Sequence, residues 1–193
     1  LVAHVRVDAL EAIRVAMAGR PSINAVLAKA AGLALRAVPE ANVSWIDGKL
    51  RRWQVADIAF AVATEDGLNV PIVRGCDIRP AQEIAADLAA RVEEARAGRL
   101  RADDIDHGQL SISNLGGFGV SRFRAILNPP QAMIIAVGAA EPHIVPTEGG
   151  YAVEKVMTLT LTVDHRAIDG AVAARFLAHV VGLLQQPDTG WLG

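Results

Sequence analysis

Apolar and polar positions follow two different periods along the 193-residue chain. Apolar residues spaced three to four apart place their side chains on one face of a helix, whereas alternation at every second residue indicates a strand. The helical period predicts helices at about 9–18, at 23–38 after Ser22, from Pro80 through at least Ala95, and at about 170–186. Alternating or continuously apolar runs predict strands at 2–7, 57–64, 109–115 and 132–138, with one or two more after Gly149 and Gly150.

The residues at the ends of these segments are typical of helix caps and tight turns. Asp8 and Ser22 can accept hydrogen bonds from the free N–H groups of a first helical turn. Pro39 ends the second helix, because proline cannot continue one. The segment NVSWIDGKLRRWQV predicts a hairpin that turns at Asp47-Gly48.

The order of these elements predicts the fold class. Helices come first, then strands and hairpins, then a terminal helix, without a regular alternation of strand and helix. That order argues against Rossmann and TIM-barrel folds and predicts one α+β domain, in which helices cover a mixed sheet. A chain of this length can bury about 70% of its unfolded surface around a single core.

Composition excludes several classes of protein. The chain is 52% hydrophobic and has a net charge of −2, which is typical of a globular protein and gives no reason to expect nucleic acid. Cys76 is the only cysteine, so neither an intrachain disulfide nor a Cys/His metal cluster is expected. Apolar runs stay below about 18 residues, and polar residues interrupt the N-terminal stretch, so we expect no membrane span and no signal peptide. The chain has no initiating Met, and we expect it to be a piece of a longer one.

The segment DHRAIDG, at 164–170, lies between the last predicted strand and the last predicted helix. Histidine ionises near neutral pH, so His165 is a candidate general base; the alternative is a polar turn residue paired with Asp164. Asp169 is well placed as the N-cap of the last helix. A metal site is disfavoured, because the strand-to-helix break separates His165 from Asp169 and a third ligand is not evident.

Two further segments are candidates for chemistry. In SISNLGGFG, Ser111 and Ser113 share one strand face, where a hydroxyl could act as a nucleophile or an oxyanion donor; the alternative is a pair of ordinary strand serines. The segment contains no GxSxG nucleophile elbow, and GGFG matches neither a Walker loop nor GxGxxG. In NPPQAMIIAVG, Pro129-Pro130 predicts an extended entry into a buried strand.

Taken together, five segments resemble the catalytic domain of the dihydrolipoamide acyltransferases, the E2 components of the 2-oxo acid dehydrogenase complexes. These segments are VPEANVSW, DGLNVPIVR, SISNLGGFG, ILNPPQAMIIAVG and DHRAIDGA. They span almost the whole chain in the family's order. The resemblance implies a fold like that of chloramphenicol acetyltransferase, with residues 1–193 as a single catalytic domain that forms trimers. The family's N-terminal segment, lipoyl domain and peripheral subunit-binding domain are then expected to be absent from this chain.

The resemblance also implies the reaction and its residues. An acyl group passes between dihydrolipoamide and coenzyme A, which is a cosubstrate; the lipoyl group is carried on a separate domain, and no metal takes part. His165 corresponds to the family's catalytic base and Ser113 to its oxyanion donor, whereas Asp169 corresponds to an acid with an orienting or structural role. In the family the histidine and the hydroxyl come from neighbouring chains. The residues that contact coenzyme A, and the acyl group itself (acetyl, succinyl or branched-chain), stay open.

The implied partners are further copies of the chain, as a homotrimer within a 24-mer or 60-mer, and the lipoyl domains, E1 and E3 of the complex. Nucleic acid and membrane are not expected. The implied compartment is the cytoplasm of a bacterium or, in a eukaryote, the mitochondrial matrix. Three alternatives are a non-catalytic core-forming scaffold, a stand-alone coenzyme A-dependent acetyltransferase, and a Ser-His-Asp hydrolase. Intact Ser113, His165 and Asp169 argue against a pure scaffold, which has no need of all three. The SNLG and NPPQ segments argue against a stand-alone acetyltransferase. The missing nucleophile elbow argues against a hydrolase.

Overall fold

The computed structural model describes residues 1–65, 67–105 and 107–193. Its helices are α1 (Asp8–Ala16), α2 (Ile23–Ala37), α3 (Ala81–Arg96), α4 (Gly170–Gln185) and α5 (Thr189–Leu192), with 3₁₀ turns η1 (Pro39–Ala41), η2 (Ala102–Asp104) and η3 (Gly116–Phe118). Its strands are β1 (Val2–Arg6), β2 (Val43–Ile46), β3 (Lys49–Arg52), β4 (Ile58–Phe60), β5 (Val62–Thr64), β6 (Gly67–Asn69), β7 (Ile72–Val73), β8 (Leu110–Asn114), β9 (Met133–Thr147) and β10 (Gly150–Val163).

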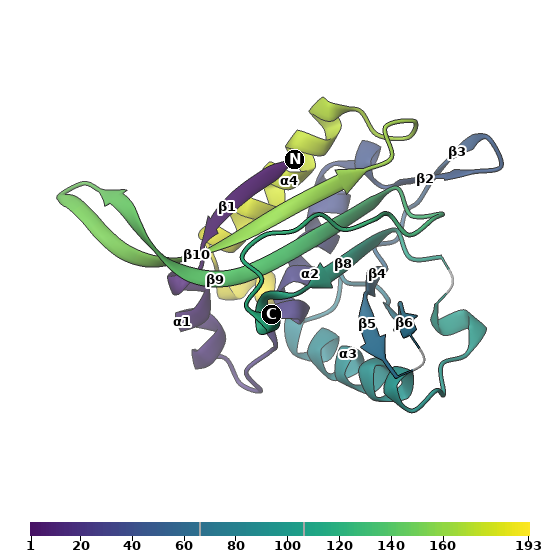
Figure 1. Ribbon diagram of the computed structural model, residues 1–193, viewed down its shortest axis with the longest axis horizontal. Coiled ribbons are helices and arrows are strands. Elements are labelled where there is room, and N and C mark those ends of the chain that lie inside the picture. Colours follow the sequence, from purple (N-terminus) through teal and green to yellow (C-terminus); the bar gives the residue numbers. More distant parts are fainter. Residues whose placement is uncertain (66, 106) are drawn as a thin grey trace.

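The main sheet has six strands in the order β1-β10-β9-β8-β4-β7 (Figure 1). β8 runs parallel to β4 and β9, and the other neighbouring pairs are antiparallel. The sheet is therefore mixed, and the predicted α+β class is confirmed. Two small hairpins, β2–β3 and β5–β6, lie outside this sheet. Asp47 and Gly48 both have positive φ angles (50° and 74°), as the predicted hairpin turn requires.

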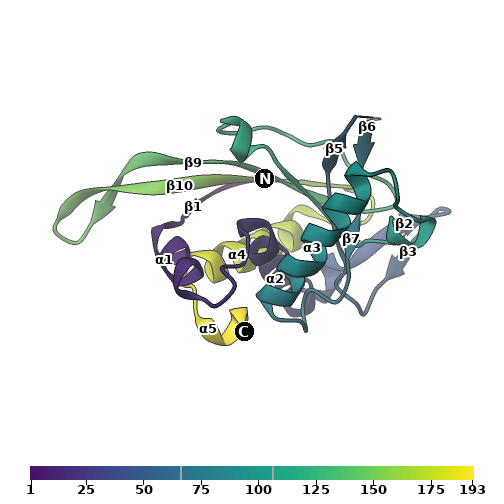
Figure 2. The same ribbon diagram turned by 90° about the horizontal axis from the view of Figure 1, so that it is seen from below.

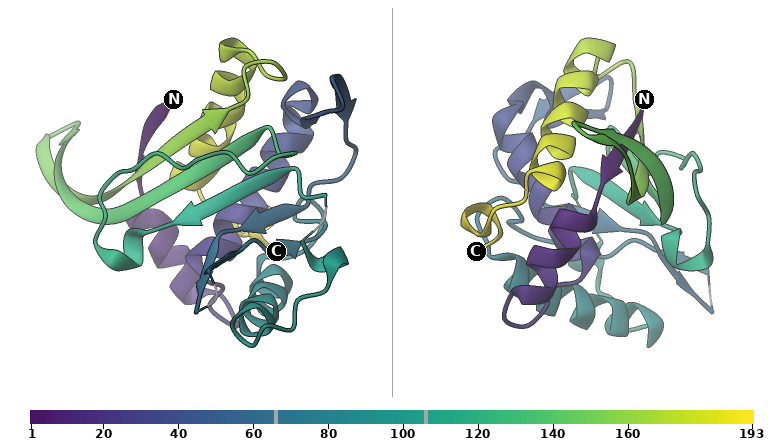
Figure 3. Two further views of the ribbon diagram at one scale, coloured as in Figure 1. Left: turned by 45° about the vertical axis from the view of Figure 1, so that its right-hand side comes forward. Right: turned by 90° about the vertical axis from the view of Figure 1, so that its left-hand side faces the viewer.

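The helices cover only one face of the sheet. Figures 2 and 3 show α1, α2, α3 and α4 on one side of the strands, while the segment 115–131 crosses the opposite side (Figure 1). The paired strands β9 and β10 extend well beyond the body of the domain as a long hairpin. None of the helices in the described ranges is long and apolar enough to cross a membrane.

The alternation along β10 separates the core from the opposite face. Leu159 and Leu161 are fully buried against the helices, at 0% and 1% exposure, and belong to the main apolar core. Thr160, which lies between them, and Thr162, which follows Leu161, point to the other side of the strand, because successive strand residues face opposite ways. We call that side the outer face. Ser111 and Ser113 of β8 lie on it too, because Leu110 and Ile112 between them belong to the core.

Three local expectations need correction. Asp8 is the first residue of α1 rather than its cap, and its carboxylate accepts a hydrogen bond from the Lys155 N–H at 3.0 Å. The run 57–64 forms two strands, β4 and β5, because its hydrogen-bond partner changes from β8 to β6 after Phe60. Pro129 and Pro130 form a turn, closed by the Gln131 N–H donating to the Asn128 carbonyl. The predicted segment DGLNVPIVR begins at Asp66, which lies outside the described residues; the rest supplies β6 and β7.

Gly138 on β9 holds the crossing segment against the outer face. The Ala139 N–H donates to the Val120 carbonyl at 2.8 Å, and a Cβ atom on Gly138 would lie 2.0 Å from the carbonyl oxygen of Ser121. A side chain here can therefore fit only if the backbone of the crossing segment moves.

We expect Gly138→Ala to lower the free energy of unfolding by about 1–3 kcal/mol, because the added methyl overpacks backbone against backbone. Gly182→Ala on α4 is the matched control, since a Cβ there meets nothing within 4 Å. That variant should gain up to about 1 kcal/mol from helix propensity. Urea unfolding of both variants measures the difference, and equal midpoints for Gly138→Ala and the unmodified protein would contradict the close contact.

Candidate active site

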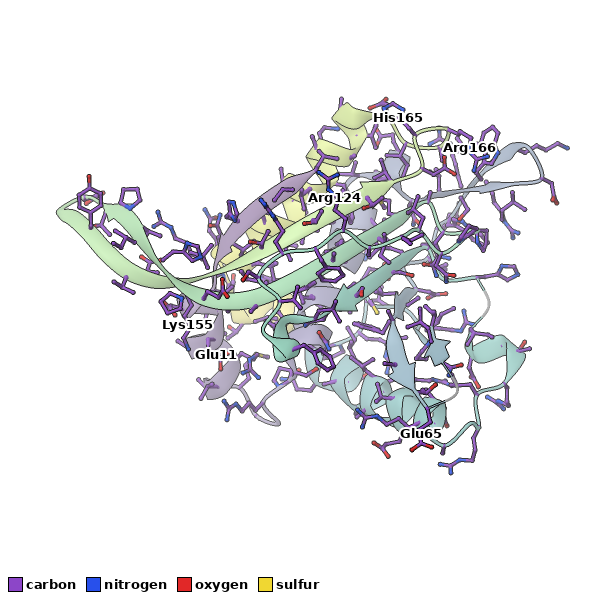
Figure 4. All side chains as sticks on the ribbon, viewed as in Figure 1. Glu11, Glu65, Arg124, Lys155, His165 and Arg166 are labelled. Carbon is purple, nitrogen blue, oxygen red and sulfur yellow. The ribbon has the colours of Figure 1, made fainter. Side chains whose placement is uncertain are left out.

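The DHRAIDG segment forms a tight turn where β10 ends. The Asp164 N–H donates to the Ala132 carbonyl at 2.8 Å, and the Asp164 carbonyl accepts from the N–H groups of Ala167 and Ile168, both at 3.0 Å. These bonds fix both ends of the turn and leave His165 in its middle, with its side chain exposed beyond the last strand pair (Figure 4). An exposed imidazole on a fixed backbone is available to a second molecule.

Asp164, which had no role assigned from the sequence, binds Arg166. The guanidinium donates from Nη2 to Oδ2 at 2.7 Å and from Nε to Oδ1 at 3.0 Å, and the Arg166 N–H donates to Oδ1 at 3.0 Å. The hydrogen bonds from the Arg166 side chain lower the pKa of Asp164. Arg166 also lies 5.6 Å from the centre of the Trp45 ring, so the turn contacts the β2–β3 hairpin. The interpretation in which His165 pairs with Asp164 is therefore not what the structure shows.

Asp169 is the N-cap of α4, as the sequence predicts. Its Oδ1 atom accepts hydrogen bonds from the N–H groups of Ala171 at 2.8 Å and Val172 at 2.9 Å. The bond from Val172 contributes most to lowering the pKa of this carboxyl, and the charges of Arg175 and His165 act in the same direction. The residue thus fixes the helix that follows the turn, and both of its hydrogen bonds go to that helix.

A hollow of about 340 Å³ lies beside His165. Its walls combine the turn, the end of β10, the NPPQ segment and one aromatic residue of β2. The lining residues are Trp45, Leu127, Pro129, Pro130, Gln131, Val163, Asp164, His165 and Arg166. Segments far apart in the sequence therefore meet around the imidazole. Trp45 and Leu127 were not singled out by sequence reasoning, because an isolated apolar residue carries no signal that separates a pocket wall from a core position.

The two serines of SISN have different surroundings. Ser111 is 1% exposed and donates a short hydrogen bond to Oε1 of Gln131, so its hydroxyl ties β8 to the NPPQ segment. Ser113 is partly exposed, and its hydroxyl makes no hydrogen bond within the described parts of the chain. The strand end just beyond it is fixed by Asn114, which donates to Asn24 at 2.7 Å and accepts from the Gly116 N–H at 2.9 Å. Of the two serines, only Ser113 thus has a hydroxyl without a hydrogen bond among the described residues.

Within one copy of the chain, Ser113 and His165 do not meet. Ser113 is aligned with Ala136 of β9, which is aligned with Thr160 of β10. That alignment places Ser113 roughly 10 Å from Thr160, across two strand spacings. From Thr160, β10 continues for three more residues, roughly 10 Å, and His165 lies beyond its end, in the turn. The two residues cannot act on the same atom of a substrate unless they come from different copies. Among the described residues, no group of three or more His, Cys, Asp or Glu side chains could hold a metal ion.

The whole chain matches one family of proteins. The family model of the 2-oxoacid dehydrogenases acyltransferase (catalytic domain) matches residues 1–192. The chain is 41% identical to the dihydrolipoyllysine-residue acetyltransferase component 2 of the mitochondrial pyruvate dehydrogenase complex of Arabidopsis thaliana, over 88% of this chain and 32% of that protein. It is 36% identical to the corresponding component of Rickettsia bellii, over 86% of this chain and 40% of that protein. The chain thus belongs to the 2-oxoacid dehydrogenase acyltransferase family, and it spans about a third to two fifths of the length of these two relatives.

Solved structures agree with that assignment. The dihydrolipoamide acetyltransferase of Azotobacter vinelandii has a TM-score of 0.90 and 33% identity, over 96% of this chain and 80% of that one. A serine, a histidine and an asparagine of that enzyme, spaced by 52 and 4 positions, have been investigated for their role in its catalytic mechanism. The cubic core of a pyruvate dehydrogenase multienzyme complex matches equally well. Chloramphenicol acetyltransferase, at 18% identity and a TM-score of 0.62, shares the fold.

The free energy of unfolding should depend on Asp169 in a way that separates its hydrogen bonds from its charge. Its pKa is lowered in the folded state, so the carboxylate stabilises the fold above the unfolded-state pKa, near 3.9, and that stabilisation is lost as pH falls through the folded-state pKa. We expect Asp169→Asn, which keeps the cap, to unfold near the midpoint of the unmodified protein at pH 7 and to lose less stability on going to pH 3. Asp169→Ala should be destabilised already at pH 7. Urea midpoints at both pH values check this, and equal midpoints for the two variants at pH 7 would contradict it.

Proposed function

We propose that this chain transfers an acyl group between dihydrolipoamide and coenzyme A, in a site shared by two copies of the chain. The observation that carries the proposal is the separation of two free groups, the exposed imidazole of His165 and the unbonded hydroxyl of Ser113, on different parts of one copy. Ser113, His165 and Asp169 are spaced by 52 and 4 positions, as are the serine, histidine and asparagine of the Azotobacter vinelandii enzyme. Asp169 takes the place of that asparagine and is assigned a positioning role, because both side chains can cap a helix.

His165 acts as the base in this mechanism. An alkyl thiol has a pKa near 8.5, so only a small part is thiolate at neutral pH and a nearby base is needed. The imidazole takes the proton from the thiol of coenzyme A as its sulfur attacks the carbonyl carbon of the acyl-dihydrolipoamide. The protonated imidazole then gives the proton to the departing sulfur of dihydrolipoamide. The bond from the acyl carbon to the dihydrolipoamide sulfur breaks as the new thioester to coenzyme A forms, one proton passes from one sulfur to the other, and no acyl-enzyme forms.

Ser113 of the neighbouring copy stabilises the intermediate. Attack on the thioester places a negative charge on the carbonyl oxygen of a tetrahedral species, and a hydroxyl donor at that position lowers the barrier. The serine need not lose its proton, so it requires no base of its own. That agrees with the absence of any hydrogen-bond partner for its hydroxyl among the residues described.

The relatives support a more specific version of the proposal. Those matched here are named as acetyltransferase components of pyruvate dehydrogenase complexes, and we infer acetyl as the acyl group. The match to a cubic core supports trimers that build a larger assembly, with lipoyl domains, E1 and E3 as partners. The alternative of a non-catalytic scaffold predicts a chain without acyl-transfer activity, so activity assays distinguish the scaffold from the enzyme.

We expect Ser113→Ala to reduce kcat by roughly two to three orders of magnitude with little change in the KM of either substrate, because the lost hydrogen bond forms chiefly in the transition state. Acetyl transfer from acetyl-coenzyme A to free dihydrolipoamide measures this. Ser121→Ala removes an exposed hydroxyl on the crossing segment and serves as the control. A normal kcat in Ser113→Ala would remove Ser113 from the mechanism.

His165→Ala should be nearly inactive, because the thiol loses its base. His179→Ala is the control, since His179 is an exposed histidine on α4 that does not line the hollow. Thioester formation is followed by its absorbance in the ultraviolet for both variants. If His165→Ala kept the activity of the unmodified protein, the proposed function would fall.

A mixing experiment tests whether the site is shared. Copies with Ser113→Ala and copies with His165→Ala are unfolded together and reassembled at equal amounts. If each site takes one residue from each of two copies, about one site in four receives an intact histidine and an intact serine, because the copies are distributed at random around a cyclic assembly. About a quarter of the normal activity should return, whereas a site within one copy would recover none.

A further inference from the structure

Gln131, the last residue of the NPPQ segment, lines the hollow beside His165, although the proposed mechanism gives it no task. It is only 5% exposed, so its amide group is surrounded by protein rather than by solvent. A buried polar group that loses its hydrogen-bond partner destabilises its surroundings, because it cannot turn to water instead. The contacts of this side chain therefore bear directly on the wall of the hollow.

Three elements around the hollow meet at Gln131. Its Oε1 atom accepts a hydrogen bond from the hydroxyl of Ser111 on β8, and both side chains are buried. Its backbone forms an isolated antiparallel bridge to Ser44 of β2. The carbonyl of the next residue, Ala132, accepts a hydrogen bond from the Asp164 N–H at 2.8 Å, at the start of the turn after β10. One position in the chain thus connects β8, the β2–β3 hairpin and the turn.

These contacts lie directly beside the residues that line the hollow. Trp45 follows Ser44 along β2, and His165 follows Asp164 in the turn; both line it. A displacement of Gln131 is therefore passed on to the aromatic wall and to the imidazole through a single neighbouring residue in each case.

The bond to Ser111 anchors the NPPQ segment beyond the edge of the sheet. β9 begins at Met133, and its pairing with β8 begins at Ile134, so the ladder between these two strands does not extend to Gln131. β8 itself is held on both sides, by β4 and by β9. The side-chain bond thus joins a segment outside that ladder to a strand inside it. Its loss is expected to shift the segment rather than the strand.

We propose that Gln131 is a positioning residue: its bond to Ser111 fixes the NPPQ segment and, through Ala132, the turn that carries His165. The inference rests on the proposed function, because it concerns the placement of the base assigned there. Ser113 of the same chain is held independently, by the strand pairs of β8 and by Asn114. Breaking the bond should therefore displace the base of one site and leave the serine that serves the neighbouring site in place.

The first test is kinetic. Gln131→Ala and Ser111→Ala should each lower kcat by roughly ten- to a hundredfold with a smaller change in KM, because a small misplacement of a catalytic group slows the reaction. The double variant should lose no more than Gln131→Ala alone, since both changes remove the same bond. Ser111→Thr keeps the hydroxyl and should restore kcat.

Gln109→Ala is the matched control. Gln109 is also a buried glutamine, its Oε1 atom accepts from the Asp57 N–H at 2.7 Å, and it does not line the hollow. This variant should be less stable to urea but keep its kcat under conditions where it is folded. A fall in kcat equal to that of Gln131→Ala would show that any lost buried bond has this effect, and would overturn the inference.

Mixed assemblies show which half of the site Gln131 positions. In the first mixture, Gln131→Ala is placed on the Ser113→Ala copies, which supply the histidine to His165→Ala copies. In the second, it is placed on the His165→Ala copies, which supply the serine. Without Gln131→Ala, about a quarter of the normal activity is expected. That activity should fall roughly ten- to a hundredfold in the first mixture and be unchanged in the second. Equal losses in the two mixtures would overturn the inference.

Hydrogen exchange tests the geometry without turnover and separates the two proposals. In Gln131→Ala, the amide of Asp164 should exchange roughly tenfold faster, because its bond to Ala132 opens more often. Mass spectrometry of a peptide covering 164–169 measures this, and a peptide covering α3 should exchange as in the unmodified protein. Unchanged exchange at Asp164, or an unchanged kcat, would overturn this inference alone. Faster exchange at Asp164 in a chain that transfers no acyl group would overturn the proposed function alone.

Discussion

The pairing of β9 with β10 is the constraint on which the rest of the structure depends. Thirteen residue pairs align the two strands, and the same register gives β10 one face in the core and one face outside it. Leu159 and Leu161 pack against the helices, so Thr160 and Thr162, which alternate with them, must face outward, because a shift by one residue would exchange the two sets. The same register fixes where β10 ends and therefore where His165 lies.

The crossing segment depends on that pairing in turn. It lies against β9 only because Gly138 leaves space for the backbone of Ser121, and its NPPQ residues then line the hollow beside His165. Ser111 holds the far end of this segment through Gln131, a contact between two buried side chains. The position of the crossing segment is thus set by backbone fit and by one buried hydrogen bond, rather than by the residues assigned to the chemistry.

The proposed division of the site between two copies accounts for why each half looks incomplete. A base and an oxyanion donor within one chain are normally in reach of each other, yet here they are separated by several strand positions and by two strands. Each half is instead held rigidly by its own chain: the turn around His165 by Asp164, Arg166 and Asp169, and the end of β8 by Asn114. Rigid halves can form a working site on assembly without rearranging.

The sequence alone determined the elements, the fold class and the candidate residues, because they depend on local patterns. The 3.6-residue and two-residue periods located the main helices and most strands, Ser22 and Asp169 could be recognised as caps, and the order of motifs indicated the family. Asp8 was misjudged as a cap because its actual partner, the N–H of Lys155, lies 147 positions away. The partner of Asp164 was also missed, although Arg166 is close in sequence, because an ion pair depends on the turn geometry.

Only the tertiary structure decided which residues are neighbours. It distinguished Ser111, bonded to Gln131, from Ser113, which is free, although the two residues alternate identically in the sequence. It also brought Trp45, the NPPQ segment and His165 together around one hollow, and it separated Ser113 from His165 within a copy. The reason is physical: periodicity fixes which way a side chain points from its own strand, whereas strand order and register, which arise from packing the whole core, fix what it meets there.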